Sequence, residues 1–348
     1  MILLLLLLGL QEQVSESSVS VPPKPTPPIP EGPAGLAAKY PGDVGIEKDP
    51  DVVFAESFDG PIDAICARWD SVAGQPIMSK SDDVPPGSGG RQSLLLTRTA
   101  GGTGGYTDGG NFYRQLNEGY DRLHFRFYMK FNKDHAPIHH YGAAFLGYNP
   151  PSRWPKGGAG LRPKGNDSFV TQVEPGDFTS WNFYSYWQHM GGSPPRGQTW
   201  GNSFEHEVPA RTVQKEKWIC LEVMLKMNAV GDRDGEQAYW LDGKLSRKGD
   251  QITSYLGKGF PSSGTWVFDK FFPGVEREGV FWDYAKGKST ANVGGKPFPG
   301  FAWRGSPDLK INALWLYRYM SKPETGVSQV WWDHLVVAKS YIGPLAPK

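Results

Sequence analysis

The sequence contains little cysteine, no long apolar run and almost no excess of one charge. Two cysteines, Cys66 and Cys220, occur in 348 residues, which allows one disulfide or two buried thiols but no cysteine-rich framework. Lys and Arg number 37 against 36 Asp and Glu, for a net charge of +1. So small an excess argues against general binding to nucleic acid or to a membrane surface. Phosphate-binding loops, dinucleotide-binding glycine motifs and serine-nucleophile elbows are also missing.

The N-terminal region has a composition of its own. It begins with MILLLLLLGL, which is too short to span a bilayer and resembles the apolar part of a secretory signal, without the basic start or a clear cleavage site. We therefore expect residues 1–16 to be a signal-like leader, and the protein to be secreted or to lie at the cell surface or in the periplasm. Residues 17–50 are polar and dense in proline, which predicts a disordered, extended linker without tertiary contacts.

The remainder of the chain, residues 51–348, alternates apolar and polar residues in short runs that clusters of Gly, Pro, Asn and Asp interrupt. Alternation with a period of two is typical of strands with one buried face, and we find no long helical period. Many strands without an internal repeat predict one all-β domain, an antiparallel two-sheet sandwich or jelly roll with long loops. The clearest strands are expected at residues 52–58, 91–99, 122–131, 168–174, 181–190, 217–227, 236–245, 310–320 and 329–342.

Several segments taken together resemble a known family. They are GGTGGYTDGGNFYRQL, LHFRFYMKF, HHYGAAFLGYN, WNFYSYWQ, WICLEVMLKMN with DGEQAYWLDGK, and VWWDHLVVAKSYIGP. This succession is similar to the concanavalin A-like jelly-roll superfamily, and within it to the polysaccharide-lyase-like group that includes alginate and glucuronan lyases. The resemblance implies two bent antiparallel sheets with a glycan groove on the concave one. The Arg-x-Glu-x-Arg and Gln-x-His motifs of alginate lyases and the Glu-x-Asp-x-x-Glu strand of laminarinase-type glucanases are absent, so no catalytic set transfers as a unit.

One expected strand, RLHFRFYMKF at residues 122–131, is apolar on one side and basic or aromatic on the other. We expect the apolar side, which includes Phe125 and Phe127, to lie in the core. The other side fits a groove for uronic-acid chains, because Arg binds a carboxylate through two parallel hydrogen bonds and Lys supplies a point charge. The alternative is a solvated convex surface. The polar row consists of Arg122, His124, Arg126, Tyr128 and Lys130.

A second strand, WNFYSYWQHM at residues 181–190, has phenols and amides in one row. That row, Asn182, Tyr184, Tyr186 and Gln188, offers hydrogen-bond donors, acceptors and ring surfaces that suit sugar hydroxyls and the apolar faces of sugars. Lyases of the similar family use a tyrosine as the acid beside an amide or Arg that neutralises the carboxylate. The resemblance therefore implies such roles for Tyr184 or Tyr186 with Gln188. The alternative is a polar outer face with cross-strand tyrosine pairs.

The segment between these strands carries histidines and cations. His135, His139 and His140 are expected in a loop after the basic strand, and His139 or His140 is a candidate base, because imidazole titrates near neutral pH. The alternatives are loop histidines bonded to the backbone, or a metal site, for which no further ligands appear at regular spacing. The loop NPPSRWPKGGAGLRPKGND follows, and its Trp154 and Arg162 suit the rim of a groove.

These residues lead to one main hypothesis. We expect a polysaccharide lyase that cleaves an acidic glycan by β-elimination. Arg126 with Lys130 or Gln188 would neutralise the uronate, while a histidine and a tyrosine act as base and acid. The hypothesis requires Arg126, Tyr184 or Tyr186, and His139 or His140 to line the same concave face. Tyr128, Asn182, Trp154 and Arg162 would add substrate contacts.

Two alternatives stay open at this stage. The first is a non-catalytic glycan-binding or surface-structural protein that uses the same groove. The second is a glycoside hydrolase built around Glu222, which would need a second carboxyl group that the strand spacing does not supply. We expect a monomer without cofactors. Asp232 and Asp234 could hold a structural calcium ion, and a hydrogen-bonded turn is the alternative.

Overall fold

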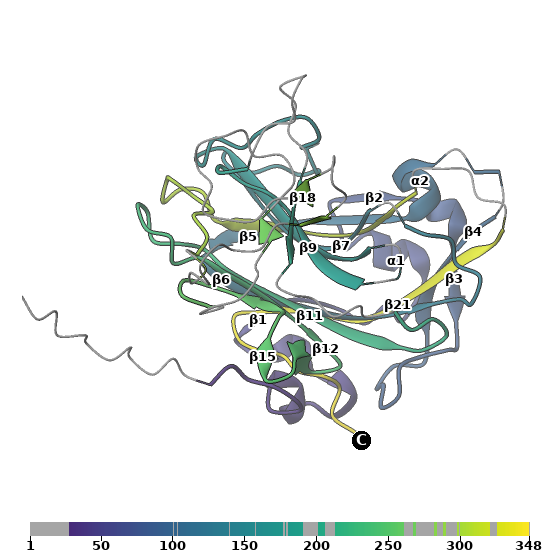
Figure 1. The fold of residues 1–348 in the computed structure, drawn as a ribbon. Coiled ribbons are helices and arrows are strands. Elements are labelled where there is room, and N and C mark those ends of the chain that lie inside the picture. The colour runs from purple at the N-terminus through teal and green to yellow at the C-terminus, as the bar shows by residue number, and fades with distance from the viewer. Residues whose placement is uncertain are drawn as a thin grey trace, which may run out of the picture.

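A computed structural model describes residues 28–348 except residues 100, 103, 139, 157, 177, 179, 191–200, 206–212, 261–266, 269–281, 284–287, 290–297, 299, 321–325 and 348. The described chain forms two large antiparallel sheets that pack face to face (Figure 1). We call them sheet A and sheet B. This arrangement confirms the all-β sandwich that the alternating sequence predicts.

Sheet A contains nine strands within the described residues. Its order is β13 (Lys244–Leu245), β12 (Glu236–Leu241), β11 (Ile219–Lys226), β6 (Arg122–Phe131), β21 (Ser328–Ala338), β4 (Ser93–Arg98) and β3 (Met78–Ser81). In addition, β1 (Val52–Glu56) pairs with β21, and β16 (Tyr255–Leu256) pairs with β12.

Sheet B contains eight strands within the same residues. Its order is β17 (Val267–Phe268), β10 (Asn202–Glu205), β9 (Ser180–Tyr186), β8 (Ser168–Gly176), β7 (His140–Tyr148), β20 (Ile311–Tyr319), β5 (Asn111–Tyr120) and β2 (Ser71–Ala73). Two short ladders lie outside the sandwich sheets: β14 (Arg247–Lys248) with β15 (Gln251–Ile252), and β18 (Trp282–Asp283) with β19 (Lys288–Ser289).

The helices of the described residues are all short. None of them is long and apolar enough to cross a membrane. Those of 3-10 type are η1 (Leu36–Lys39), η2 (Pro41–Asp43), η3 (Ile46–Lys48) and η4 (Gln75–Ile77), and those of α type are α1 (Ile62–Cys66) and α2 (Gly105–Gly109).

The core lies between the facing sides of the two sheets. Phe125 and Phe127 of β6 have no exposed surface. The ring of Phe125 lies 5.9 Å from that of Phe145, and the ring of Phe127 lies 6.4 Å from that of Tyr141. Both partners are on β7 of the opposite sheet. The apolar row of β6 is therefore a core row, as its sequence predicts. The matching row of β11 is also buried and consists of Leu221, Val223 and Leu225.

Replacing Phe127 by Ala is expected to lower the free energy of unfolding by about 3–5 kcal/mol, because a buried aromatic ring is lost and a cavity remains. Urea denaturation measures the change. Val230→Ala is a suitable control, because Val230 is 48% exposed and a surface substitution should change stability by less than about 0.5 kcal/mol. A cost for Phe127→Ala as small as that of the control would contradict the assignment of the core.

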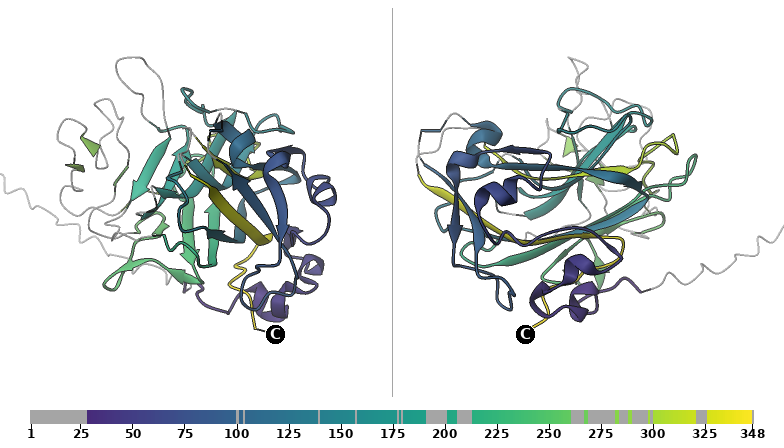
Figure 2. Two further views of the ribbon diagram at one scale, coloured as in Figure 1. Left: turned by 90° about the vertical axis from the view of Figure 1, so that its right-hand side faces the viewer. Right: turned by 180° about the vertical axis from the view of Figure 1, so that it is seen from behind.

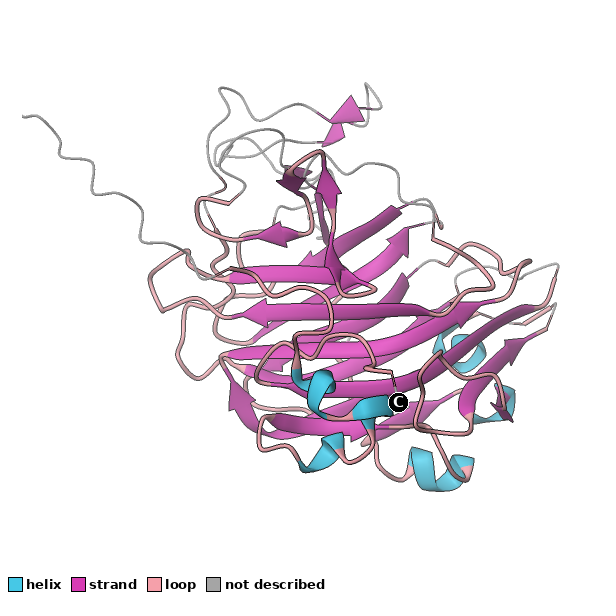
Figure 3. Ribbon diagram, turned by 90° about the horizontal axis from the view of Figure 1, so that it is seen from below, coloured by secondary structure: helices cyan, strands magenta, loops and turns pink. Residues whose placement is uncertain are grey.

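The segment of residues 28–50 packs on the outer face of sheet A, where the sequence predicts a disordered linker (Figures 2 and 3). Leu36 and Ala37 are buried in a cluster with Ile342. The backbone amides of Leu36 and Ala37 donate to the carbonyls of Tyr341, at 3.0 Å, and of Ile342, at 2.9 Å. A Cβ atom at Gly35 would collide with the Ile342 carbonyl, so glycine permits this close approach.

The linker prediction is therefore wrong for residues 28–50, and residues 17–27 lie outside the described part of the chain. The proline-rich segment contains three apolar residues that pack against the outer side of β21. They are Leu36, Ala37 and Ile46. The folded domain accordingly begins before residue 51. Figure 2 shows this segment beside the C-terminus, under the lower sheet.

Candidate functional site

The polar side of β6 faces away from the core, and the N- and C-terminal segments cover it. Arg126 is fully buried, although we expected it to line a groove. Its Nη2 donates to Oδ2 of Asp43 at 2.7 Å, and its Nη1 donates to the carbonyl of His334 at 3.0 Å. Tyr128 is 7% exposed, and its hydroxyl accepts from the amide of Leu345 at 2.8 Å. Neither side chain is available to a glycan.

Lys130 and Glu222 lie on the same face of sheet A, and both are engaged in contacts within the protein. Lys130 forms an ion pair with Asp83 and lies 4.5 Å from the ring centre of Trp331. Glu222 is 1% exposed, and it bonds Nδ1 of His124 at 2.8 Å while accepting from the amide of Ile342 at 2.9 Å. Glu222 therefore ties the C-terminal segment to sheet A. The groove assignment of β6 and the hydrolase built around Glu222 are both wrong.

The outer face of sheet B gathers a different set of side chains. In the register of the sheet, Tyr319 of β20 lies opposite His140 of β7, and Glu174 of β8 lies opposite Asn182 of β9. These four strands are neighbours in the order β9, β8, β7, β20. Successive side chains of a strand point to opposite faces of the sheet. The register therefore brings the outward residues of four strands together on one face.

We call this set the His140 cluster. It contains His140, Glu174, Asn182, Tyr184, Tyr186 and Tyr319. Nδ1 of His140 lies 3.1 Å from Oε2 of Glu174, and the imidazole ring lies 4.6 Å from the ring of Tyr184. The His140 side chain is 26% exposed, so it is reached by solvent.

The cluster orients its histidine. A carboxylate only accepts hydrogen bonds, so Nδ1 of a neutral His140 carries the hydrogen toward Glu174, and Nε2 carries the lone pair. Glu174 is itself held by Nε2 of Gln172 at 2.9 Å, and Oε1 of Gln172 accepts from the hydroxyl of Tyr317 at 2.5 Å. Such a chain of hydrogen bonds fixes the imidazole in one tautomer and orientation.

Tyr184 is the tyrosine nearest to the histidine. Burial raises the pKa of its phenol well above the usual value, and the neighbouring Tyr186 and Glu174 raise it further. Its hydroxyl lies 3.3 Å from that of Tyr186 and accepts from the amide of Gly201 at 3.0 Å. Tyr184 therefore stays protonated at neutral pH, as a general acid must before it donates its proton.

A loop beside β7 adds cations near the cluster. A cavity of about 270 Å³ is lined by Tyr148, Lys156, Arg162 and Tyr186 among others. Nζ of Lys156 lies 5.3 Å from the ring centre of Tyr148. Trp154 of the same loop is 63% exposed. This loop, residues 149–165, thus carries an exposed aromatic ring and two cations beside Tyr186.

The remaining candidates have other surroundings. His140 begins strand β7 and is not in a loop, while His139 lies outside the described residues. His135 is buried, and its Nε2 lies 2.9 Å from Nη1 of Arg318. Gln188 follows the end of β9 and donates to the carbonyl of Ala302 at 2.7 Å. Asn182 stays in the cluster, and its Oδ1 is buried without a partner among the described residues.

The expected set is therefore brought together only in part. His140, Tyr184 and Tyr186 share one face of sheet B, but Arg126 lies on sheet A. The lyase hypothesis with Arg126 as the neutralising group is wrong. Sequence reasoning missed Gln172 and Tyr319 and did not see Glu174 as the partner of His140. The alternation of the strand TQVE assigns Gln172 and Glu174 to its outward row, and the alternation of β20 does the same for its tyrosines. These rows were the sequence signal that could have identified the missed residues.

The cysteines and the acidic turn have simple roles. Cys66 and Cys220 are free thiols, and burial raises the pKa of the Cys220 thiol to about 12. That thiol is therefore unreactive at neutral pH. Oδ1 of Asp234 accepts from the amide of Ala229 at 2.7 Å, as in a hydrogen-bonded turn. In the part of the chain that the structure describes, no His, Cys, Asp and Glu side chains group so that they could hold a metal ion.

Comparison with known proteins gives a fold. No family model and no curated protein matches the sequence. The structure is similar to the marine PL-14 alginate lyase from Aplysia kurodai, with a TM-score of 0.51 and 11% identity over 83% of this chain and 99% of that one. It is also similar to alginate lyase vAL-1 from Chlorella virus, with a TM-score of 0.50 and 12% identity over 83% and 99% of the two chains.

A third likeness is weaker. The endo-β-1,4-glucuronan lyase from the fungus Trichoderma reesei has a TM-score of 0.42 and 17% identity, over 83% of this chain and 95% of that one. At such identities the first two likenesses show a shared jelly-roll fold and no more. The chemistry has to come from the residues of this chain.

Proposed function

We propose that the protein is an exported polysaccharide lyase that cleaves an acidic glycan by β-elimination on the outer face of sheet B. The observation that carries the proposal is the His140 cluster, in which the ring of a histidine oriented by Glu174 lies 4.6 Å from the ring of a protonated tyrosine, Tyr184. Export rests on the apolar start of the sequence alone.

The cluster supplies the two proton transfers of the reaction. Nε2 of His140 takes the proton next to the uronate carboxylate. The phenol of Tyr184 gives its proton to the oxygen of the departing sugar, so that the glycosidic bond breaks as the double bond forms. General acid and base groups of this kind each contribute roughly 10²–10⁴-fold to a rate.

The developing negative charge needs donors, and Arg126 has no part in this proposal. The amide of Asn182 stands on β9 next to Tyr184 in the outward row and lies opposite Glu174, and we assign it to the reacting carboxylate. Lys156 and Arg162 line the cavity beside Tyr186, and we assign them to the carboxylate of a neighbouring sugar. Charge-assisted hydrogen bonds of Arg to carboxylates favour an acidic chain.

The carboxyl groups argue for elimination over hydrolysis. Glycoside hydrolysis requires two of them, one on each side of the scissile bond. Within the described cluster, Glu174 is the one carboxylate, and it is already bonded to His140 and Gln172. A lectin-like protein would use the same aromatic face without turnover, and the test below separates these activities.

The proposal is tested with a panel of polyuronates and neutral glucans, followed by product analysis. A lyase produces an unsaturated uronate that is conjugated with its carboxylate and absorbs in the ultraviolet. New reducing ends without this chromophore would indicate hydrolysis and refute the lyase. Binding without either product would favour the glycan-binding alternative.

The role of the rim is tested by Arg162→Gln and Lys156→Gln. Each is expected to raise KM roughly tenfold and leave kcat nearly unchanged, because a charge-assisted contact of about 1.4 kcal/mol is lost in both ground and transition state. Arg153→Gln is the matched control, because Arg153 lies in the same loop but pairs with Asp70 at 3.9 Å. A KM that is unchanged in both rim variants would remove the loop from the binding site.

A further inference from the structure

A second cluster lies on the opposite side of the molecule, under the N-terminal segment. Oγ of Ser88 lies 2.6 Å from Nε2 of His334, and Nδ1 of His334 lies 3.0 Å from Oδ2 of Asp43. The three residues come from a glycine-rich turn, from strand β21 and from η2. A nucleophile within hydrogen-bond reach of a base, which a third group orients, is the arrangement of a serine hydrolase triad.

The hydrogen bonds have one direction. Burial raises the pKa of Asp43, but Arg126 and His334 outweigh burial and hold that pKa below its usual value. The ionised Asp43 accepts from Nδ1, so Nε2 of His334 in its neutral form can accept the hydroxyl proton of Ser88, which also lies 3.3 Å from the carbonyl of Gly90. Arg126 clamps both partners, because it donates to Asp43 at 2.7 Å and to the carbonyl of His334 at 3.0 Å.

The backbone at this cluster is unusual. Asp43 has a φ of 60° and His334 a φ of 47°. This is the left-handed backbone region, which residues other than glycine rarely adopt. The register of β21 against β6 also shifts between Asp333 and Val336, and such a bulge re-aims a side chain out of the regular alternation. Strained residues that the surrounding fold holds in place are typical of functional sites.

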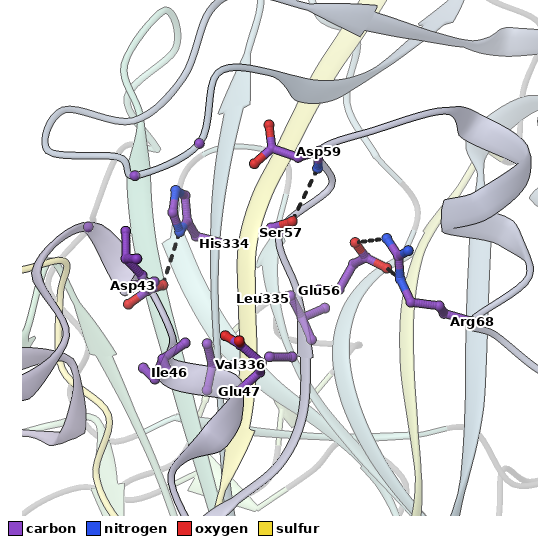
Figure 4. A pocket seen from close by; sticks show the side chains of 15 residues that line it. Asp43, Ile46, Glu47, Glu56, Ser57, Asp59, Arg68, His334, Leu335 and Val336 are labelled. Atoms are coloured by element: carbon purple, nitrogen blue, oxygen red, sulfur yellow. Dashed lines mark hydrogen bonds and ion pairs between the residues drawn. The ribbon is translucent and has the colours of Figure 1, made fainter.

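A cavity opens beside the cluster. Its volume is about 350 Å³, and His334, Asp43, Gly89, Gly90 and Arg68 are among the residues that line it (Figure 4). This volume is within the usual range of small-molecule sites. Figure 4 shows His334 and Asp43 on one side of the cavity and Arg68, paired with Glu56, on the other. Ser88 itself is not among the lining residues, but Gly89 and Gly90 next to it are, so the cavity has room for a small acyl group between the histidine and the turn that carries Ser88.

We propose that Ser88, His334 and Asp43 form a second catalytic site that cleaves small carboxylic esters. Oγ of Ser88 attacks the ester carbonyl while Nε2 of His334 takes its proton. The carbon–oxygen bond to the alcohol then breaks, and the alcohol leaves with that proton. Water next attacks the acyl-serine, His334 again relays the proton, and the acid and free Ser88 are released.

The site lacks one part of an efficient hydrolase. The amide of Gly89 donates to the carbonyl of Gly42 at 2.9 Å, and the amide of Gly90 donates to Oγ of Ser88 at 3.0 Å. These nearest amides do not form a ready oxyanion hole, and loss of one such donor costs roughly 10²–10³-fold in rate. We expect an activated serine with slow turnover, so labelling of the serine is a better test than turnover.

The experiment treats the full chain with a fluorophosphonate probe and locates the adduct by peptide mass spectrometry. The expected product is a phosphonyl ester on Ser88, formed as fluoride leaves. Ser88→Ala should abolish it. His334→Asn should slow it ~10²-fold or more, because the general base is removed and asparagine tolerates the left-handed backbone. Asp43→Asn should slow labelling as well.

Ser57→Ala is the matched control. Ser57 lines this cavity, but its hydroxyl accepts from the amide of Asp59 and bonds no histidine among the described residues. Labelling of Ser88 should be unchanged in this variant. Absence of an adduct on wild-type Ser88, or equal labelling rates of wild type and His334→Asn, would overturn the proposal. If the His334 or Asp43 variants unfold, the wild-type protein still decides, because Ser88 should be labelled and Ser57, whose hydroxyl accepts from the amide of Asp59, should not. The outcome is independent of the lyase activity, which resides on sheet B.

Discussion

Tyr184→Phe is expected to reduce formation of the unsaturated product by roughly 10²–10⁴-fold, because the phenol that protonates the departing sugar is removed. Binding of the glycan should change little, since the ring and its contact with the His140 ring at 4.6 Å remain. His140→Asn should cause a loss of similar size by removing the base. A combined variant should lose little more than either single one, because residues that act as a unit are not additive.

The matched control for these substitutions is Tyr113→Phe. Tyr113 lies on the same outer face of sheet B, in a neighbouring apolar cluster with Trp315, and its hydroxyl donates to the carbonyl of Ser152 at 2.8 Å rather than to the His140 cluster. Its loss should cost about 1 kcal/mol of stability and leave the rate within a few-fold. If Tyr184→Phe and Tyr113→Phe lower the rate equally, Tyr184 is not the acid.

Arg126→Met is expected to lower the free energy of unfolding by about 3–5 kcal/mol, because it leaves the buried carboxylate of Asp43 without its cation. Asp43 bonds Arg126 at 2.7 Å and holds η2 on sheet A. The second substitution Asp43→Asn, made in the Arg126→Met background, should recover part of the loss, since no buried charge then remains. Denaturant unfolding of the two variants and of their combination measures this coupling.

Arg122→Met is the control, because Arg122 is in the same row of β6 but is exposed. Its effect should stay within about 0.5 kcal/mol. A small effect of Arg126→Met would mean that the N-terminal segment contributes little to the fold.

The pH dependence of the free energy of unfolding gives a second check. The folded-state pKa of Asp43 is lowered, so its stabilisation is present above the unfolded pKa and is lost as the pH falls through the folded pKa.

The two sheets therefore have different tasks. On sheet A, the terminal segments cover the outward row of β6 and its charges become internal ion pairs, such as Arg126 with Asp43. On sheet B, loops leave the His140 cluster within reach of solvent. In the proposed function a long glycan binds the outer face of sheet B, and the cavity of the proposed Ser88 site lies on the covered side of sheet A.

The alternation of the chain determined which side of each strand is buried. A period of two assigns Phe125 and Phe127 to the core from the sequence alone, since every second side chain points to the same face. The same rule placed Tyr184 and Tyr186 in one outward row. Residue chemistry was enough to select His139 or His140 as a candidate base, although not to find Glu174, the carboxylate that bonds His140.

Only the tertiary structure decided which outward row is covered and which stays within reach of solvent. Periodicity states that one face of β6 is polar, but the sheet to which β6 belongs depends on pairing with strands far along the chain, such as β11 and β21. The cover of Arg126 comes from Asp43, 83 residues earlier, in a segment whose composition predicts disorder. Likewise, Glu174 reaches His140, 34 residues away, only through the register of neighbouring strands. A local pattern specifies which side of a strand is buried. Which residues from distant parts of the chain meet in a site is specified by the pairing of strands far apart in the sequence.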